Sequence, residues 1–533
     1  MSQHDSDQMT HREIMEALSG LLLAMFVAML SSTIVSNALP RIVADLHGSQ
    51  TGYTWVATAT LLAMTATTPI WGKLADLFSK KLLVQLALVV YVVGSLLASA
   101  SQSMGMLIGA RVIQGIGVGG LMSLVQIVIA SMVPPRERGR YSGYIGAVFA
   151  AATVAGPLIG GVIVDSALGW RGCFWVGAPV AVVAFVLLQR TLHLPVIKRE
   201  VKIDYLGATL LVAGVSLLLI WVSMAGSQYD WLSVTTVVMV LGGIALLALA
   251  AYVEGRIASE PVIPLHLFKD RTTSLATVAS IFIGIAMFGA TYYLSEYFQD
   301  SRGMSPTKAG LMSICMVGGL MVSSLVTGRL ITRTGRWKRY LVGGSLLLTA
   351  GFALLSTLDG DTNLVLIGLF MVVVGIGLGA TNQNLVLAVQ NNAAQANTGA
   401  ATAVVTFFRS MGGAIGVSAL GAVLSHQVQT KVTDGVPALI ESGKVTTDQV
   451  AALEGGSVPD ISSLPDGLRQ LYESSFGSAS GHLFLIAAPL AAIAFVAIIF
   501  IKEVRLRTEL ADLSEEEVAP DAAAELEAGG ALR

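Results

Sequence analysis

The sequence predicts an all-α integral membrane protein whose helices cross the bilayer about fourteen times. Of its 533 residues, 54% are hydrophobic and only 12% carry a charge, whereas ordinary soluble domains contain about 25% charged residues. A soluble chain of this length needs a charged exterior around its cores. The chain has too little charge to form that exterior, so its main solvent must be lipid.

Apolar runs of spanning length recur along the chain. A spanning helix needs about 20 mainly apolar residues, because lipid offers no hydrogen-bond partner to free backbone groups. Each run is expected to form one helix. The first series is 17–39, 54–75, 82–101, 105–131, 141–165, 171–189, 205–224 and 233–252, and the second is 272–298, 307–328, 340–357, 363–389, 399–425 and 482–501.

Lysine and arginine concentrate in alternate loops between these runs, for example in 134–140 and 329–339. Basic loops stay on the cytoplasmic side of a membrane. Both termini are then cytoplasmic, and we expect a multi-pass protein of the bacterial inner (plasma) membrane.

The two halves of the chain repeat one another weakly. Parallel repeats of this kind place a substrate path between the halves, near the middle of the bilayer. The repeat therefore favours transport as the function. Three pairs of segments share an offset of 256 to 260 residues: Gly72-Lys73-Leu74 and Gly328-Arg329-Leu330, 115–119 and 375–379, and 156–160 and 412–416.

The repeat also predicts how the chain is divided, because 205–252 has no counterpart in the second half. The bundles are expected to hold six helices each. The predicted parts are a cytoplasmic N-terminus (1–16), a first bundle (17–190), two inserted helices (204–252), a second bundle (272–501) that includes an outward-facing loop (426–480), and an acidic, disordered cytoplasmic tail (506–533).

The loop after the second run contains Gly72, Asp76, Lys80 and Lys81. A tight turn needs small residues, and a carboxylate at the membrane edge can pair with a nearby cation or cap a helix. The alternative is a generic basic loop. The echo of this loop in the second half favours a role in conformational change.

The fourth run carries Arg111 and a glycine series that begins at Gly115. Glycines at this density permit close helix approach. A cation inside a membrane is costly and usually has a partner or a function. The alternative for Arg111 is that its side chain reaches out to the lipid headgroups.

The fifth run contains Gly156-Pro157 and Gly160-Gly161. A proline bends the helix by removing a backbone hydrogen bond, and glycines let neighbouring helices approach. This segment is expected to take part in conformational change, with a purely structural kink as the alternative.

Together these motifs resemble the major facilitator superfamily over about 15–505. The loop from Gly72 resembles the signature loop of that superfamily, with Ser79 where glycine is usual. The 156–161 segment resembles its antiporter motif, and Thr33-Ile34-Val35 is similar to the drug:proton antiporter branch with fourteen spans. The resemblance implies two six-helix bundles with two inserted helices, and proton-driven export of hydrophobic or cationic compounds.

One departure concerns proton coupling. That branch has an acid just before the Thr-Ile-Val run, whereas this chain has Ser31-Ser32 there. Burial would raise the pKa of a carboxyl group toward the working pH, as a proton carrier requires. Glu296 is therefore the remaining candidate, and Arg111 could form an ion pair with it across the cavity. The alternative is that Glu296 is an interfacial acid. Asp165 completes this group as an outer-gate or capping residue.

A set of polar and aromatic residues is expected to line the substrate cavity, where methionines would supply an adaptable apolar wall. For any single member, a structural contact between helices is the alternative. The set is Ser31, Asn37, Gln126, Tyr292, Tyr293, Asn382, Gln383 and Arg409.

The leading function is therefore a secondary active exporter that exchanges protons for amphiphilic small molecules by alternating access. An uncoupled or differently coupled carrier of a lipid or metabolite, and a non-transporting membrane scaffold, are the alternatives. We expect a functional monomer in the lipid bilayer, with no cofactor, no metal and no nucleic-acid partner. An enzyme is not expected, because no nucleophile arrangement or His/Cys cluster is present and the two cysteines, Cys173 and Cys315, lie apart.

Overall fold

The computed structural model describes residues 11–47, 50–164, 166–194, 204–226, 228–258, 260–394, 397–441, 445 and 465–508. Within these ranges every extended element is a helix, and the one β-bridge, between Ala225 and Tyr229, is isolated. The predicted all-α class is confirmed.

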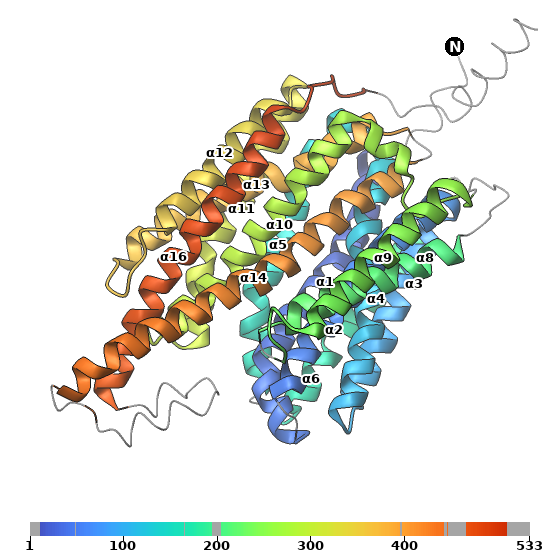
Figure 1. The fold of residues 1–533 in the computed structure, drawn as a ribbon. Coiled ribbons are helices and arrows are strands. Elements are labelled where there is room, and N and C mark those ends of the chain that lie inside the picture. Colours follow the sequence, from blue (N-terminus) through green and yellow to red (C-terminus); the bar gives the residue numbers. More distant parts are fainter. Residues whose placement is uncertain are drawn as a thin grey trace, which may run out of the picture.

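The first half of the chain forms one group of packed helices (Figure 1). Helix α4 packs against α2 and α3, and α1 packs against α5 and α7. The predicted sixth span is broken into two helices near Val176. The helices are α1 (His11–Asp45), α2 (Gln50–Leu77), α3 (Lys80–Ser99), α4 (Met104–Met132), α5 (Pro135–Val164), α6 (Gly169–Trp175) and α7 (Gly177–Thr191).

The second half forms a similar group after the 3₁₀ helix η2 (Leu265–Lys269). Helix α13 packs against α11 and α12, and α10 packs against α14 and α16. The elements are α10 (Arg271–Glu296), the π-helix η3 (Tyr297–Ser301), α11 (Pro306–Thr334), α12 (Lys338–Leu355), α13 (Leu364–Asn392), α14 (Thr398–Glu441) and α16 (Asp466–Ile499).

Between the halves, α8 (Tyr205–Met224) and α9 (Val234–Arg256) pack against each other. Helix α8 also contacts both α2 and α14, where Leu211, Val215 and Leu219 share an apolar cluster with Val404 and Phe407. Helix α8 therefore covers the line along which α2 of one half meets α14 of the other, and α9 packs on α8.

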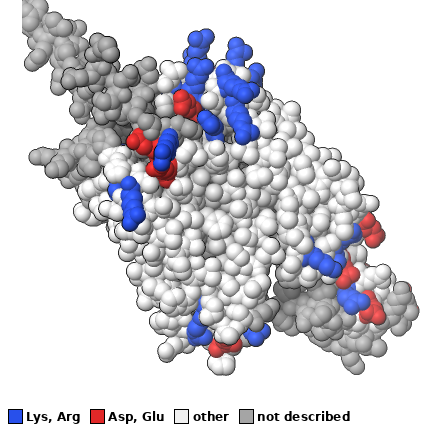
Figure 2. All heavy atoms as spheres, turned by 180° about the vertical axis from the view of Figure 1, so that it is seen from behind, with Lys and Arg blue, Asp and Glu red and all other residues white. Residues whose placement is uncertain are grey.

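Twelve helices in the described part of the chain are long and apolar enough to cross a membrane. The predicted count of fourteen is not confirmed. Helices α2 and α12 form where spans were expected but do not reach the same apolarity, because α2 is rich in threonine and α12 begins with Lys338 and Arg339. Figure 2 shows an almost uncharged middle of the surface, with most of the visible Lys and Arg at one end.

The internal repeat is visible in the glycine contacts of α4 and α13. A Cβ on Gly115 would lie 2.6 Å from the Thr60 carbonyl oxygen of α2, and a Cβ on Gly117 would lie 2.5 Å from the Tyr91 amide nitrogen of α3. In the second half, Gly375 faces α11 and Gly377 faces α12 in the same way. Glycine is required at these positions because the backbones of three helices meet there.

The prediction of a loop at 426–480 is wrong at both ends of the segment, where the structure has helices. Helix α14 continues to Glu441, and α16 already begins at Asp466. At 44 residues α14 is about 66 Å long, twice the thickness of a bilayer core. The continuation is stabilised by apolar contacts, since Leu471 of α16 packs on Gly435 of α14. The middle of the predicted loop, 446–464, lies outside the described residues.

Candidate functional site: a central cavity and its closed end

A cavity of about 230 Å³ lies between the two halves. Its wall is formed by four helices of the first half (α1, α2, α4 and α5) and four of the second (α10, α11, α13 and α14). The two halves therefore contribute corresponding helices to the wall. Its walls are mainly apolar. The largest apolar side chains are Met25, Met29, Met64, Met122, Phe149, Met287 and Phe288.

Four of the predicted cavity residues line this space: Gln126, Asn382, Gln383 and Arg409. An Arg409 guanidinium N–H donates to the Asn382 carbonyl oxygen at 3.3 Å. The side-chain oxygens of Gln126 and Asn382 are buried and have no hydrogen-bond partner among the described residues. The cavity therefore offers a cation and two unsatisfied amide oxygens within mainly apolar walls.

The other predicted cavity residues lie elsewhere. Ser31 is buried beside the hydroxyl of Tyr91, Tyr292 is 54% exposed, and the Tyr293 hydroxyl donates to the Val417 carbonyl of α14. The Asn37 side chain lies outside the described residues.

Sequence reasoning missed Ser32, which lines the cavity in place of its neighbour Ser31. Consecutive residues of a helix point about 100° apart. The motif therefore indicated the right segment of α1 but not which side of the helix faces the cavity. Met25 and Met29 lie four residues apart on α1 and line the cavity, as Ser32 does. Their spacing was the signal that could have indicated the cavity-facing side.

Arg111 does not pair across the cavity. Its guanidinium donates to the Val56 carbonyl at 3.2 Å and to the Gln114 side-chain oxygen at 2.5 Å, and the Gln114 amide donates to Ser95 at 2.8 Å. The described residues contain no ion pair between Arg111 and Glu296, so the expected cross-cavity pair is absent from this conformation. Arg111 instead joins α2, α3 and α4 within the first half.

Glu296 lies at the end of α10, where the helix widens into the π-helix η3. Its side chain is partly buried and does not line the cavity. It interacts electrostatically with Asp300 and with Tyr472 of α16. The sequence did not indicate the π-turn, which is a feature that proteins often place at functional sites. Asp165 lies outside the described residues.

We call the end of the molecule where α2 meets α14, and α5 meets α11, the closed end. At the first contact, a Cβ on Gly72 would lie 2.9 Å from the Gly399 carbonyl oxygen; at the second, a Cβ on Gly139 would lie 2.6 Å from the Gly328 carbonyl oxygen. The repeat relates the two contacts, since Gly72 corresponds to Gly328 and Gly139 to Gly399. Backbone contact at both places separates the cavity from this end.

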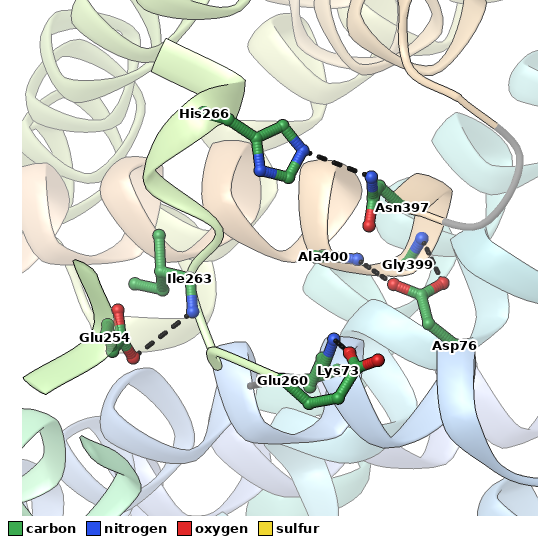
Figure 3. Close-up of polar contacts among 9 residues, drawn as sticks. All are labelled: Lys73, Asp76, Glu254, Glu260, Ile263, His266, Asn397, Gly399 and Ala400. Atoms are coloured by element: carbon green, nitrogen blue, oxygen red, sulfur yellow. Dashed lines mark hydrogen bonds and ion pairs between the residues drawn. The ribbon is translucent and has the colours of Figure 1, made fainter. Parts of the chain in front are cut away.

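Asp76 joins the halves at the first contact. Its two carboxylate oxygens accept the amide N–H groups of Gly399 and Ala400, each at 2.8 Å (Figure 3). These amides lie in the first turn of α14, where the helix leaves N–H groups without partners and carries positive dipole charge. Asp76, on α2 of the first half, therefore caps a helix of the second half.

The other residues of the Gly72–Lys81 loop make contacts around Asp76. The Lys73 ammonium pairs with Glu260, at 2.5 Å, in the segment that follows the inserted helices (Figure 3). The Lys81 ammonium donates to the Gln189 carbonyl at the end of α7. Ser79 caps α3 through its hydroxyl, which gives a physical reason for a residue other than glycine at this place. Lys80 is the first residue of α3.

At the second contact, the residue that corresponds to Asp76 in the repeat is Thr332, which is not an acid. Instead, the Arg136 amide in the first turn of α5 donates to the Arg507 carbonyl oxygen at 3.1 Å. The Arg507 amide in turn donates to the side-chain oxygen of Asn391, at the end of α13, at 3.0 Å. The chain after α16 thus connects both halves at this contact.

The predicted start of a disordered tail at Leu506 is wrong for its first residues, because Leu506 is buried and Arg507 is hydrogen-bonded as described above. Upstream, the Trp337 indole N–H donates to the Val504 carbonyl at 2.8 Å, and the Glu503 carboxylate accepts the amides of Trp337 and Lys338 at 3.1 Å. Residues 509–533 lie outside the described residues.

The glycines of the fifth run face α1. A Cβ on Gly160 would lie 3.0 Å from the Ile34 carbonyl oxygen, and Gly156 lies against Thr33, whose hydroxyl donates to the Ala152 carbonyl. Gly161 faces open space, and the Pro157 side chain lies outside the described residues. This segment therefore forms a close contact between α1 and α5 beside the cavity.

Two repeated helix groups around a central cavity are typical of a membrane transporter, and comparison with known proteins gives the family. The model of the Major Facilitator Superfamily matches residues 21–417. The chain belongs to this superfamily, as predicted, and is a transporter rather than an enzyme.

Similar proteins include the multidrug transporter protein MdtP of Bacillus subtilis, 34% identical, with 85% of this chain and 82% of that protein covered. The efflux pump dotC of Dothistroma septosporum is also 34% identical, with 93% and 85% covered. Among solved structures, the proton:xylose symporter XylE has a TM-score of 0.59 at 13% identity, with 92% and 96% covered. This last likeness shows the fold alone.

The cap by Asp76 generates a first prediction. In Asp76→Asn one of the two acceptor oxygens becomes an NH₂ group, so the helix start loses one of its two hydrogen bonds to this side chain. That loss is worth about 1 kcal/mol, or about fivefold in the open population. Hydrogen–deuterium exchange of the Gly399 and Ala400 amides should be faster by about this factor. Asp270→Asn is the matched control, because Asp270 caps its own helix α10 through Thr273. Unchanged exchange at Gly399 in Asp76→Asn would contradict the proposed cap.

The ordered chain after α16 generates a second prediction. Deleting residues 503–533 removes the partner of the Arg136 amide, so exchange at the start of α5 should be faster. Deleting only 509–533 keeps Arg507 and should leave that exchange as in the full chain. Equal protection in both truncated proteins would show that residues 503–508 do not stabilise the contact between α5 and α11.

Proposed function

We propose that this protein is a proton-coupled exporter of amphiphilic small molecules that works by alternating access. The observation that carries the proposal is the central cavity, which is lined by four equivalent helices from each half and closed at one end by the glycine contacts of Gly72 with Gly399 and of Gly139 with Gly328. A cavity between repeated halves can be opened to either side by rocking one half against the other.

The character of the cavity wall supports an amphiphilic cargo. Ligand sites are mostly apolar with a few well-placed polar groups, and this wall combines methionines and phenylalanines with Gln126, Asn382, Gln383 and Arg409. Methionine side chains adapt to ligands of different shape. The relatives named as a multidrug transporter and an efflux pump support export as the direction.

We further propose that the closed end faces the cytoplasm, because the basic loops lie on that side. The conformation described here would then be the one that releases cargo outward. Helices α2 and α12 are proposed to cross the membrane as well, which raises the number of spans from twelve to fourteen. The protein is proposed to lie in a bacterial plasma membrane and to work as a monomer. Two six-helix bundles joined by α8 and α9 are the proposed division of the chain.

Proton coupling is proposed at Glu296, which lies at a π-turn and is partly buried among Asp300 and Tyr472. A partly buried carboxylate that exchanges protons can change its charge within the transport cycle. Arg111 and Asp165 are proposed to take part in proton coupling together with Glu296. The described part of the cavity wall contains no acid, which favours uncoupled carriage as the second candidate function.

Purified protein in liposomes with an imposed pH gradient tests this proposal. Amphiphilic cargo should drive proton movement across the membrane in the wild type, and Glu296→Gln should lower its rate by about a hundredfold if Glu296 carries the proton. Glu441→Gln, at the exposed end of α14, is the control and should keep the wild-type rate.

Cargo flux without proton movement in the wild type would favour uncoupled carriage. Wild-type proton movement in Glu296→Gln would place the coupling at another residue. A correctly inserted protein that moves no amphiphile would reject the export function itself.

A further inference from the structure

We infer that the central cavity selects amphiphiles with an anionic headgroup, such as an alkyl carboxylate or sulfonate, and that Arg409 binds that headgroup. The inference rests on the proposed export function and narrows its cargo. It differs from the cationic compounds that the sequence resemblance implies.

The charges of the cavity wall carry the first step. Among the described residues that line the cavity, Arg409 on α14 is the only ionisable one; all the others are apolar, hydroxylic or amide side chains. No carboxylate among the described residues forms an ion pair with Arg409. In an apolar space charges interact far more strongly than in water, so the wall attracts an anion and repels a cation.

The hydrogen bonds of Arg409 carry the second step. The side chain is only 8% exposed, and the one contact found for its guanidinium in the described chain is the bond to the Asn382 carbonyl at 3.3 Å. A guanidinium has five N–H donors in a planar fork that matches two carboxylate or sulfonate oxygens. Most of that donor capacity remains for a ligand.

Two other buried arginines show what a structural arginine looks like in this protein. Arg111 donates to Val56 and Gln114. Arg138 donates to the carbonyls of Val133 and Ala130 and to Gln390. Both therefore have several protein partners and lie away from the cavity wall. Arg409 is the one of the three that lines the cavity, and buried cations in membrane proteins are costly unless they serve a function.

The rest of the wall determines the body of the ligand. Gln383 and Ser410 lie next to Asn382 and Arg409 in sequence and also line the cavity, so neutral polar groups surround the cation. The other helices contribute five methionines and two phenylalanines, which suit an alkyl or aromatic body, together with smaller apolar and hydroxylic residues. One anionic group on an apolar body fits this arrangement.

Matched probes test the inference on the full-length protein in a maltoside detergent. Octanesulfonate and octyltrimethylammonium have the same chain and opposite charges, and both are used below their micelle concentrations. Calorimetric titration should give a dissociation constant for octanesulfonate at least about tenfold lower than for octyltrimethylammonium.

Three variants locate the effect. Arg409→Gln should remove the preference, and Arg409→Lys should keep part of it because the charge remains. Arg302→Gln removes a cation that bonds to the loop carbonyls of Gly360 and Thr362, and it should keep the wild-type preference. Equal binding of both probes by the wild type, or a preference that survives in Arg409→Gln, would overturn the inference.

The same probes separate this inference from the export function. Export of octyltrimethylammonium with proton movement would overturn the anion preference and leave the exporter intact. Binding of octanesulfonate that depends on Arg409, in a protein that moves no probe across liposomes, would support the inference and reject export.

Discussion

Backbone contact between the two halves at the closed end is the constraint on which the rest of the structure depends. At Gly72 against Gly399 and at Gly139 against Gly328, any side chain would push the helices apart. The cavity begins two turns further along α5 and one turn further along α11, where Gly146 meets Ser324 and both residues line it. The same four glycines therefore close one end of the path and place α5 and α11 at the wall of the site.

The two contacts are equivalent in backbone but differ in polar chemistry. Asp76 caps α14 at the contact of α2 with α14, and the Arg507 carbonyl takes the equivalent role for α5 at the contact of α5 with α11. Helix α8 of the inserted pair packs against α2 and α14, which form the first of these contacts, and there Lys73 also pairs with Glu260. Insertion and terminal extension have thus made a repeated scaffold asymmetric at its closed end.

Sequence reasoning located the helices and the motifs because both depend on local chemistry. Apolar runs, basic loops and repeated glycines predicted the all-α fold and the family, and they singled out the segment that contains Asp76. The face that each helix turns to the cavity depends on packing between distant segments, which explains why Ser32 lines it instead of Ser31. The partners of Arg111 within its own half, the helical continuation to Glu441 and the docked Leu506 likewise arise from tertiary contacts that no local pattern contains.

The distance between the halves, measured at both ends of the molecule by paired spin labels, tests alternating access most directly. One pair, Arg140→Cys with Arg333→Cys, reports on the closed end, and the other, Ser166→Cys with Asp361→Cys, reports on the opposite end; all four side chains are exposed. Cys173 and Cys315 are replaced by serine. When amphiphile is added or the pH is changed, alternating access predicts that the first distance grows as the second shrinks. Distances that stay fixed, or that change in the same direction, would contradict it.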